Sequence, residues 1–198
     1  MATKGERTKS RLIEAMLELI QARGYAGTGL NAVIEHAGAP KGSLYFHFPE
    51  GKEALGAAAV ALAARDFESL VATAALAGGP PSTVASQVVE VLADLVVNSD
   101  YALGCPVSVV TLEMASESEL LRTSCAAAFE SWITPVRDYL EAYGCPPEVA
   151  AELASTIVAT IEGAVILSRA QRSVTPLGNA GRVIARLIDG SVATDGSK

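Results

Sequence analysis

The chain has 198 residues, half of them apolar, which suffices for a substantial core in one large domain or in a small domain joined to a larger one. Residues 1–7 are charged and polar, and the apolar segments 57–64 and 157–167 are shorter than the roughly 20 residues that span a bilayer, so we expect a soluble, cytoplasmic protein rather than an exported or membrane-spanning one. The net charge of −7 argues against nucleic-acid binding by the chain as a whole, but residues 1–55 hold seven Lys or Arg against six Glu, and four of these cations lie within residues 4–11.

The N-terminal segment predicts three helices, of which the second and third are short. The first runs from Glu6 to Gly24, with apolar residues at spacings of three and four before a glycine that is typical of a helix end. The second begins near Thr28, which we expect to cap it, and ends at Gly38. Pro40 suits the first position of a third helix over residues 41–47, because the N–H that proline lacks would have no partner there.

Helical spacing continues through the rest of the chain, with stops at glycine and proline. A long, alanine-rich helix is predicted for residues 52–76, and further helices are predicted for residues 82–98, 106–115, 118–142, 148–172 and 177–189. Pro135 lies inside one of them, where we expect a kink or a break. The sequence therefore predicts an all-α fold of about nine helices, divided into residues 1–51, residues 52–190 and a flexible tail at 191–198.

Two short helices joined by a tight turn, the second carrying hydroxyls, aromatics and a cation, are typical of a helix-turn-helix that places one helix in the DNA major groove. The residues go further: Gly24-Tyr25, the segment AGAPKGSLYFHF at 37–48 and Lys52-Glu53-Ala54-Leu55 together resemble the signature of the TetR (tetracycline repressor) family of transcriptional regulators, over about residues 6–55.

Two departures from the commonest signature point to a subgroup. Pro40 stands where the family usually has a hydroxyl cap, and the segment 48–52 is one residue longer. With Gly104-Cys105-Pro106 and Glu162-Gly163-Ala164, these features resemble the LmrA/YxaF-like subgroup.

The resemblance implies a helix-turn-helix DNA-binding domain at residues 1–51 and a ligand-binding and dimerisation domain at residues 52–190. It implies a ligand-responsive regulator, a repressor, that binds a near-palindromic operator on double-stranded DNA as a homodimer. A small apolar or aromatic effector then releases it from the operator.

The third predicted helix is expected to read the DNA. Lys41 and Ser43 point away from the apolar Leu44 and are the expected groove contacts. Gly42 has no side chain and would let the helix approach the duplex closely; the alternative interpretation is that it only fills a packing gap. Tyr45, His47 and Phe46 follow on the same helix. The two polar residues can donate hydrogen bonds to phosphate oxygens, and the phenyl ring either touches a thymine methyl or packs on the next helix.

Other expected DNA contacts come from outside this helix. Asn31 either reaches a base edge or is solvated. Thr28 and Lys52 are placed at helix N-termini, where backbone N–H groups and the helix dipole favour phosphate. The full predicted set is Thr28, Asn31, Lys41, Gly42, Ser43, Tyr45, Phe46, His47 and Lys52.

The family encloses its effector in the C-terminal helices, and small-molecule sites are mostly apolar with a few polar groups. The candidates for such a site are Phe67, Leu103, Cys105, Val110, Glu113, Met114, Phe129 and Trp132, with ordinary core packing as the alternative for each. Glu113 is the most informative, because an acid among apolar neighbours is costly to bury without a partner, although it could equally face solvent.

The last two predicted helices carry many small and apolar residues, and the family uses this pair of helices to form a four-helix dimer interface. An exposed stripe of this kind would be unstable in a monomer. The predicted interface residues are Ile157, Ile161, Ala164, Val165, Val183, Ile184 and Leu187.

No residue pattern predicts catalysis or a cofactor. Both histidines, His36 and His47, lie in the DNA-binding segment, and we expect His36 on a helix surface. Cys105, Cys125 and Cys145 lack the spacing of a zinc site, so we expect no metal. Two alternatives stay open: a regulator that senses redox state through a cysteine, and a helical carrier or enzyme for small molecules with a vestigial DNA-binding segment.

Overall fold

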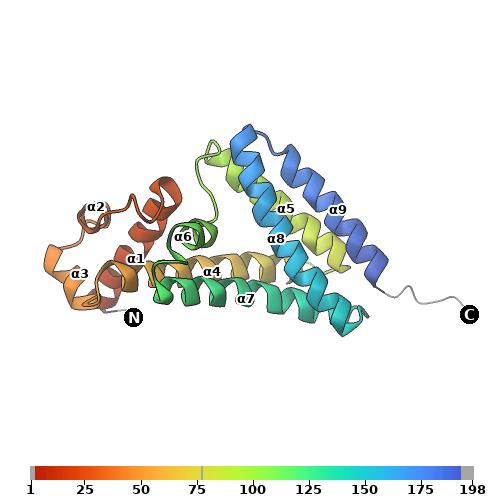
Figure 1. Cartoon of the computed structure of the whole chain (residues 1–198), viewed down its shortest axis with the longest axis horizontal. Helices are drawn as coiled ribbons and strands as arrows, with labels where there is room; N and C mark the ends of the chain where they lie inside the picture. Colours follow the sequence, from red (N-terminus) through yellow and green to blue (C-terminus); the bar gives the residue numbers. More distant parts are fainter. Residues whose placement is uncertain (1–2, 77, 193–198) are drawn as a thin grey trace, which may run out of the picture. The chain divides into compact units, whose positions relative to one another are not determined.

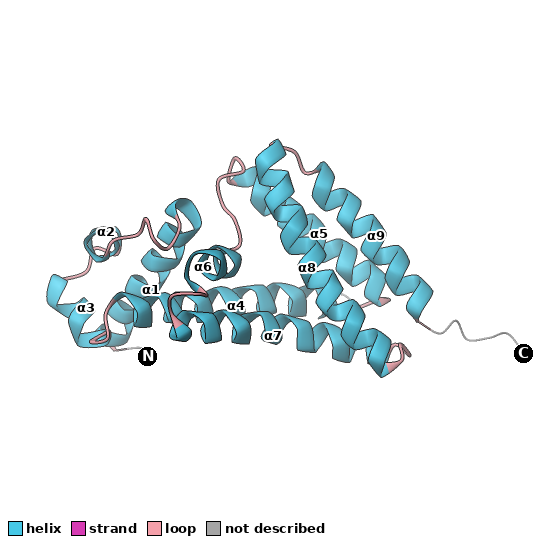
Figure 2. Cartoon of the chain, viewed as in Figure 1, coloured by secondary structure: helices cyan, strands magenta, loops and turns pink. Residues whose placement is uncertain are grey.

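The structure is a computed structural model that describes residues 3–76 and 78–192. Within these residues every element is helical and no strand is present (Figure 2). The helices are α1 (Lys4–Arg23), α2 (Leu30–His36), α3 (Lys41–His47), α4 (Lys52–Leu76), α5 (Pro81–Asn98), α6 (Pro106–Met114), α7 (Glu119–Ala142), α8 (Pro147–Gln171) and α9 (Thr175–Ser191) (Figure 1). The all-α prediction is confirmed, and the helices lie within a few residues of their predicted positions.

The chain divides into two compact units. The first comprises the residues up to 66 together with 105–128, and the second comprises 67–104 and the residues from 129 onward. Helices α4 and α7 contribute residues to both units. The functional division into a DNA-binding domain at 1–51 and an effector domain at 52–190 stays a prediction.

In the first unit, α1 packs against α2, α3 and α6. Its N-terminus is fixed by a capping box, in which the Glu6 N–H donates to the Thr3 hydroxyl and the Thr3 N–H donates to the Glu6 carboxylate. The apolar side chains of α1, α2 and α3 meet in a core that includes Leu12, Ile20 and Leu44, each fully buried. Burying side chains of this size stabilises the unit by about 1.5–3 kcal/mol each.

In the second unit, α5, α8 and α9 lie side by side and pack against one another (Figure 1). Gly181 on α9 is buried, and a Cβ there would lie 3.1 Å from Val89 Cγ1 on α5. The glycine therefore lets the two helices approach closely. Of the described residues, only α8 forms a helix that is long and apolar enough to cross a membrane by those two criteria, which a core helix also meets.

The prediction of an exposed apolar stripe on α8 and α9 is wrong for most of the residues named for it. Ile157, Ile161, Ala164, Val165 and Ile184 belong to the core that α8 and α9 build with α5 inside one chain. Each is at most 7% exposed, because α5, α8 and α9 cover one another's apolar faces in this core. Val183 and Leu187, at 43% and 47% exposure, do face solvent.

The loop between α5 and α6 is held by Arg169, in the last turn of α8, and by Arg172, the C-cap of that helix. Asp100 and Tyr101 have positive φ values of 52° and 62°, a conformation that costs a non-glycine residue about 1–3 kcal/mol. Arg172 forms an ion pair of 2.6 Å with Asp100, and Arg169 donates to the carbonyl of Ala102 at 2.9 Å. These contacts join the loop to the C-terminal end of α8.

Three further predictions differ from the structure or lie outside it. Thr28 does not cap α2: Gly29 is the N-cap and no side chain caps it. The predicted break at Pro135 is absent, because helix α7 continues through that residue, and the alternative of a kink stays a prediction. The predicted tail at 191–198 begins where α9 ends at Ser191, and residues 193–198 lie outside the described residues.

Candidate DNA-binding interface and effector region

Helix α3 presents most of its predicted DNA contacts to solvent. Leu44 is fully buried and anchors the helix, which leaves Lys41, Gly42 and Tyr45 exposed on the other side. Phe48, just after the helix, is buried under Lys9 of α1, whose ammonium lies 5.7 Å from the ring centre. A buried side chain at the middle and another at the end of so short a helix fix which face it turns outward.

Phe46 settles one of the open alternatives. Its ring is 81% exposed, and it meets the His47 ring edge to face with 5.0 Å between centroids. Packing on the next helix is therefore excluded. The phenyl ring is exposed to solvent and rests against the His47 imidazole, so it is available to contact a thymine methyl.

The predicted contacts outside α3 fall into different environments. Asn31 is exposed on α2. Thr28 is 1% exposed, and its hydroxyl donates to the Gly24 carbonyl at 2.7 Å. Thr28 therefore orders the loop between α1 and α2, and it leaves the set of proposed phosphate contacts. His36 is exposed as expected and pairs with Glu18 at 2.5 Å.

Lys52, at the first position of α4, lies over an aromatic ring. Its ammonium is 4.3 Å from the centre of the buried Tyr25 ring, which is a cation–π distance. Desolvation lowers the pKa of Lys52, and the nearby Glu113 carboxylate opposes that change. Burial raises the pKa of Tyr25 to about 12, with a smaller effect from the charge of Glu53.

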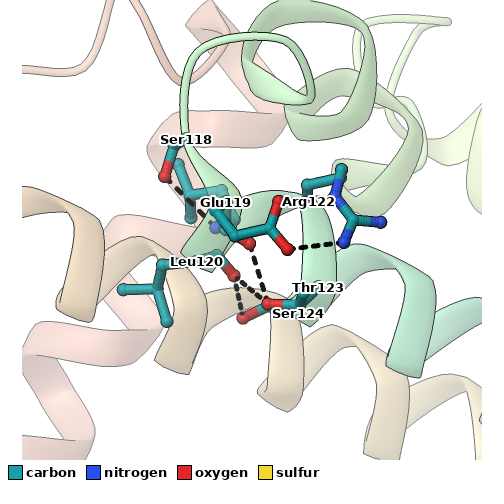
Figure 3. Close-up of polar contacts among 7 residues, drawn as sticks. Ser118, Glu119, Leu120, Arg122, Thr123 and Ser124 are labelled. Carbon is teal, nitrogen blue, oxygen red and sulfur yellow. Dashed lines mark hydrogen bonds and ion pairs between the residues drawn. The ribbon is translucent and has the colours of Figure 1, made fainter.

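Glu53, the next residue of α4, joins the start of α7. The Ser118 hydroxyl donates to the Glu53 carboxylate at 2.7 Å and accepts from the Leu121 N–H at 3.2 Å. Ser118 is buried, whereas the neighbouring pair of Glu119 and Arg122 is exposed (Figure 3). The first turn of α7 is therefore capped by a serine that α4 also holds.

Glu113, predicted as an effector contact, has a different partner. One carboxylate oxygen accepts a hydrogen bond of 2.7 Å from the Ala26 N–H, in the loop between α1 and α2. The other oxygen lies where a Cβ on Gly24 would be. The carboxylate of the half-buried Glu113 thus binds the loop that precedes the helix-turn-helix.

The remaining effector candidates divide between the two units. In the second unit, Trp132 packs against Phe67 and Phe129, with ring centroids at 4.7 Å and 5.4 Å. Leu103 is 39% exposed in the same unit. In the first unit, Val110 is fully buried, and Cys105 and Met114 lie half-buried at the two ends of α6.

The cysteines show little sign of reactivity. Burial raises the pKa of Cys125 and of Cys145, which disfavours the reactive thiolate at both positions. Cys105 is half-buried at the start of α6. Among the described residues no group of three His, Cys, Asp or Glu could hold a metal ion.

Three contacts have no counterpart among the residues predicted from the sequence. They are the ring of Tyr25 beneath Lys52, the hydrogen bond from Ser118 to Glu53, and the hydrogen bonds from Arg169 to the loop before α6. A serine just before an apolar helix is a recognisable cap signal, so Ser118 could have been found. The other two contacts join residues far apart in the chain and leave no local pattern.

Comparisons with known proteins place this geometry in a family. Residues 12–59 match the family described as bacterial regulatory proteins, tetR family. Residues 81–183 match the C-terminal domain of the LmrA/YxaF-like transcriptional regulators.

Individual proteins agree with these matches. The chain is 34% identical to the HTH-type transcriptional regulator LmrA of Bacillus subtilis (strain 168), over 86% of this chain and 90% of that protein. It is 33% identical to the uncharacterized regulator YxaF of the same organism, over 89% of this chain and 92% of that protein. A TetR transcriptional regulator of Chloroflexus aurantiacus J-10-FL, known from its crystal structure, is 29% identical with a TM-score of 0.80 over 96% of this chain and 98% of that one.

The exposed α3, the N-terminal signature and these similarities over most of the chain agree. The chain belongs to the TetR family of DNA-binding transcriptional regulators, in its LmrA/YxaF-like group.

Proposed function

We propose that this regulator is a cytoplasmic repressor that binds a near-palindromic operator as a homodimer and leaves it when a small apolar or aromatic effector binds. The observation that carries the proposal is the outward face of α3, where Lys41, Tyr45 and Phe46 are exposed beside a glycine that leaves room for a duplex. Ser43 and His47 are half-buried on the same helix, and Asn31 is exposed on α2. We propose Lys41, Ser43, Phe46 and Asn31 as base contacts, and Tyr45, His47 and Lys52 as phosphate contacts.

Electrophoretic mobility shifts with the DNA that flanks the coding region test operator binding. Lys41→Ala should change the preference among operator variants, whereas Lys52→Ala should weaken binding to operator and random duplexes alike. Equal losses on both kinds of DNA for both variants would contradict this division of roles. A wild-type protein that shifts no DNA would favour the carrier or enzyme alternative.

The exposed apolar residues of α8 and α9 support a dimer. Ile166 and Leu167 on α8, and Val183 and Leu187 on α9, are 43–52% exposed on two helices that pack together. A second copy of the chain would cover them and present α3 twice, as a near-palindromic operator requires. Leu187→Glu should therefore yield monomers in sedimentation, whereas Leu112→Glu, at an 80% exposed leucine on α6, should not.

The cluster of Phe67, Phe129 and Trp132 supports an aromatic effector, because these rings gather around the only tryptophan of the chain. Release from DNA follows from linkage if the effector prefers a conformation that the operator disfavours. Helix α4, which begins at Lys52 and includes Phe67, is the proposed lever, through a pendulum-like shift. A thermal-shift screen of aromatic compounds, read also by Trp132 fluorescence, tests effector binding. Equal effector affinity with and without bound operator would contradict the coupling.

A further inference from the structure

The loop from Gly24 to Gly29 sets how α2 and α3 follow α1. It begins with a left-handed glycine, since Gly24 has a φ of 78°. Two internal hydrogen bonds order it: the Thr28 hydroxyl donates to the Gly24 carbonyl, and the Thr28 N–H donates to the Tyr25 carbonyl at 3.1 Å. The N–H of Ala26 points the other way and is satisfied from outside the loop.

Glu113 supplies that bond from the last turn of α6. Its carboxylate accepts from Ala26 at 2.7 Å, a distance typical of a charge-assisted hydrogen bond. The second carboxylate oxygen fills the space beside Gly24. Helix α6 packs against α1, so the acid reaches the loop from a helix that is itself fixed to the first helix of the DNA-binding segment.

The surroundings argue that the acid has no direct role on DNA. Glu113 is half-buried and negatively charged, so it would repel a phosphate rather than bind one. Its charge acts on Lys52, where it opposes the lowering of the ammonium's pKa by desolvation. The carboxylate therefore fixes the backbone of the loop through Ala26 and favours the charged form of Lys52, without itself contacting DNA.

We infer that Glu113 is a positioning residue for DNA binding, because its hydrogen bond to Ala26 pins the loop from which α2 and α3 are presented. The inference rests on the proposed function of α3 and adds a residue remote from the DNA. Glu113 holds one conformation of the loop, and that conformation is the one that binds the operator.

Three variants of the full-length protein test this role, with a duplex of the DNA flanking its coding region as the probe. Glu113→Ala should weaken operator binding about tenfold, as expected for the loss of a hydrogen bond to a charged group. Glu113→Gln keeps a carbonyl acceptor and should stay within about threefold of the wild type. Glu117→Ala removes an exposed acid after the end of α6 and should not change the affinity.

Two readouts separate positioning from general stability and from DNA contact. Amide exchange at Ala26, followed by NMR without DNA, should accelerate in Glu113→Ala and not in Glu117→Ala. The dependence of affinity on salt should stay as in the wild type, because no phosphate contact is lost. If Glu113→Ala folds poorly, amide exchange in the wild type still decides whether the hydrogen bond forms: the Ala26 amide should be protected, and rapid exchange there would overturn the inference.

If the wild type binds the duplex and Glu113→Ala binds it with the same affinity, the inference is overturned and the proposed function is not. A loss that matches only the unfolded fraction would also overturn it. A wild-type protein that does not bind the duplex would instead contradict the proposed function, while Ala26 exchange would still report whether the pin exists.

Discussion

The ammonium of Lys52 lies 4.3 Å from the centre of the Tyr25 ring, and this pair joins the start of α4 to the loop after α1. The Tyr25 side chain beneath it is 3% exposed. Burial, and to a smaller extent the charge of Glu53, disfavours the phenolate, so Tyr25 stays neutral well into alkaline pH. The contact ties together two segments that the family signature contains but that lie 27 residues apart in this chain.

Tyr25 should ionise near pH 12 in the folded protein, above its ordinary value of 10.0. Because the folded-state pKa is raised, the stabilisation by the neutral phenol is complete below pH 10 and is lost as the pH rises through about 12. Phenolate absorbance titrations of the wild type and of Tyr25→Phe measure this. The difference between them is needed because the pKa of Tyr139 is raised too, by its hydrogen bond to Tyr143. A difference curve centred at pH 10 would contradict the prediction.

Gly42→Ala should separate stability from DNA binding. A Cβ at Gly42 would meet nothing within 4 Å, so the variant should gain about 0.5–1 kcal/mol of unfolding free energy from the higher helix propensity of alanine. The new methyl would nevertheless stand between α3 and the duplex, and operator affinity should fall at least about tenfold. Gly190→Ala, at another open helical glycine, is the control that should be stabilised without a change in affinity. Urea unfolding and mobility shifts measure the two effects, and unchanged binding by Gly42→Ala would remove this glycine from the interface.

Ser118→Ala should cost about 1–2 kcal/mol of unfolding free energy. The substitution removes the N-terminal cap of α7 and the hydrogen bond to Glu53 together. Thr123→Ala, one turn further along the helix, is the matched control (Figure 3). Its exposed hydroxyl only bonds back to helix carbonyls, so its loss should change stability by less than about 0.5 kcal/mol. Equal effects of the two changes in urea unfolding would argue against the cap.

Gly104→Ala and Arg169→Ala should not be additive. A Cβ on Gly104 would occupy the position of the Arg169 guanidinium, which must then leave the carbonyls of Tyr101 and Ala102. Each single change should therefore cost about 1 kcal/mol, and the double variant should cost little more than either one. Urea unfolding of the four proteins in the cycle measures the coupling. Additive losses would mean that the arginine and the glycine act independently.

Cys125 and Cys145 should resist alkylation in the native protein, because burial raises the pKa of both thiols. Cys105 is half-buried and should be modified first. Mass spectrometry after iodoacetamide treatment of native and urea-unfolded protein ranks the three sites. Operator binding should also survive mild peroxide. Loss of binding that a reductant restores would revive the redox-sensing alternative.

The sequence by itself determined the helices and the family. Helical spacing, glycine and proline stops and the segment 37–48 are local, so they can be recognised before any contact is known. The same local rules placed Leu44 inside and Lys41 outside on α3, and the structure agrees.

Only the tertiary structure decided which apolar faces remain open and which polar groups meet. Ile157 and Val183 look alike in the sequence, yet one is 5% exposed in the core with α5 and α9, and the other is 43% exposed. Glu113 meets Ala26 across 87 residues of chain. Burial and pairing of this kind depend on how distant segments pack. The apolar spacing within a helix does not indicate which other segments will cover it.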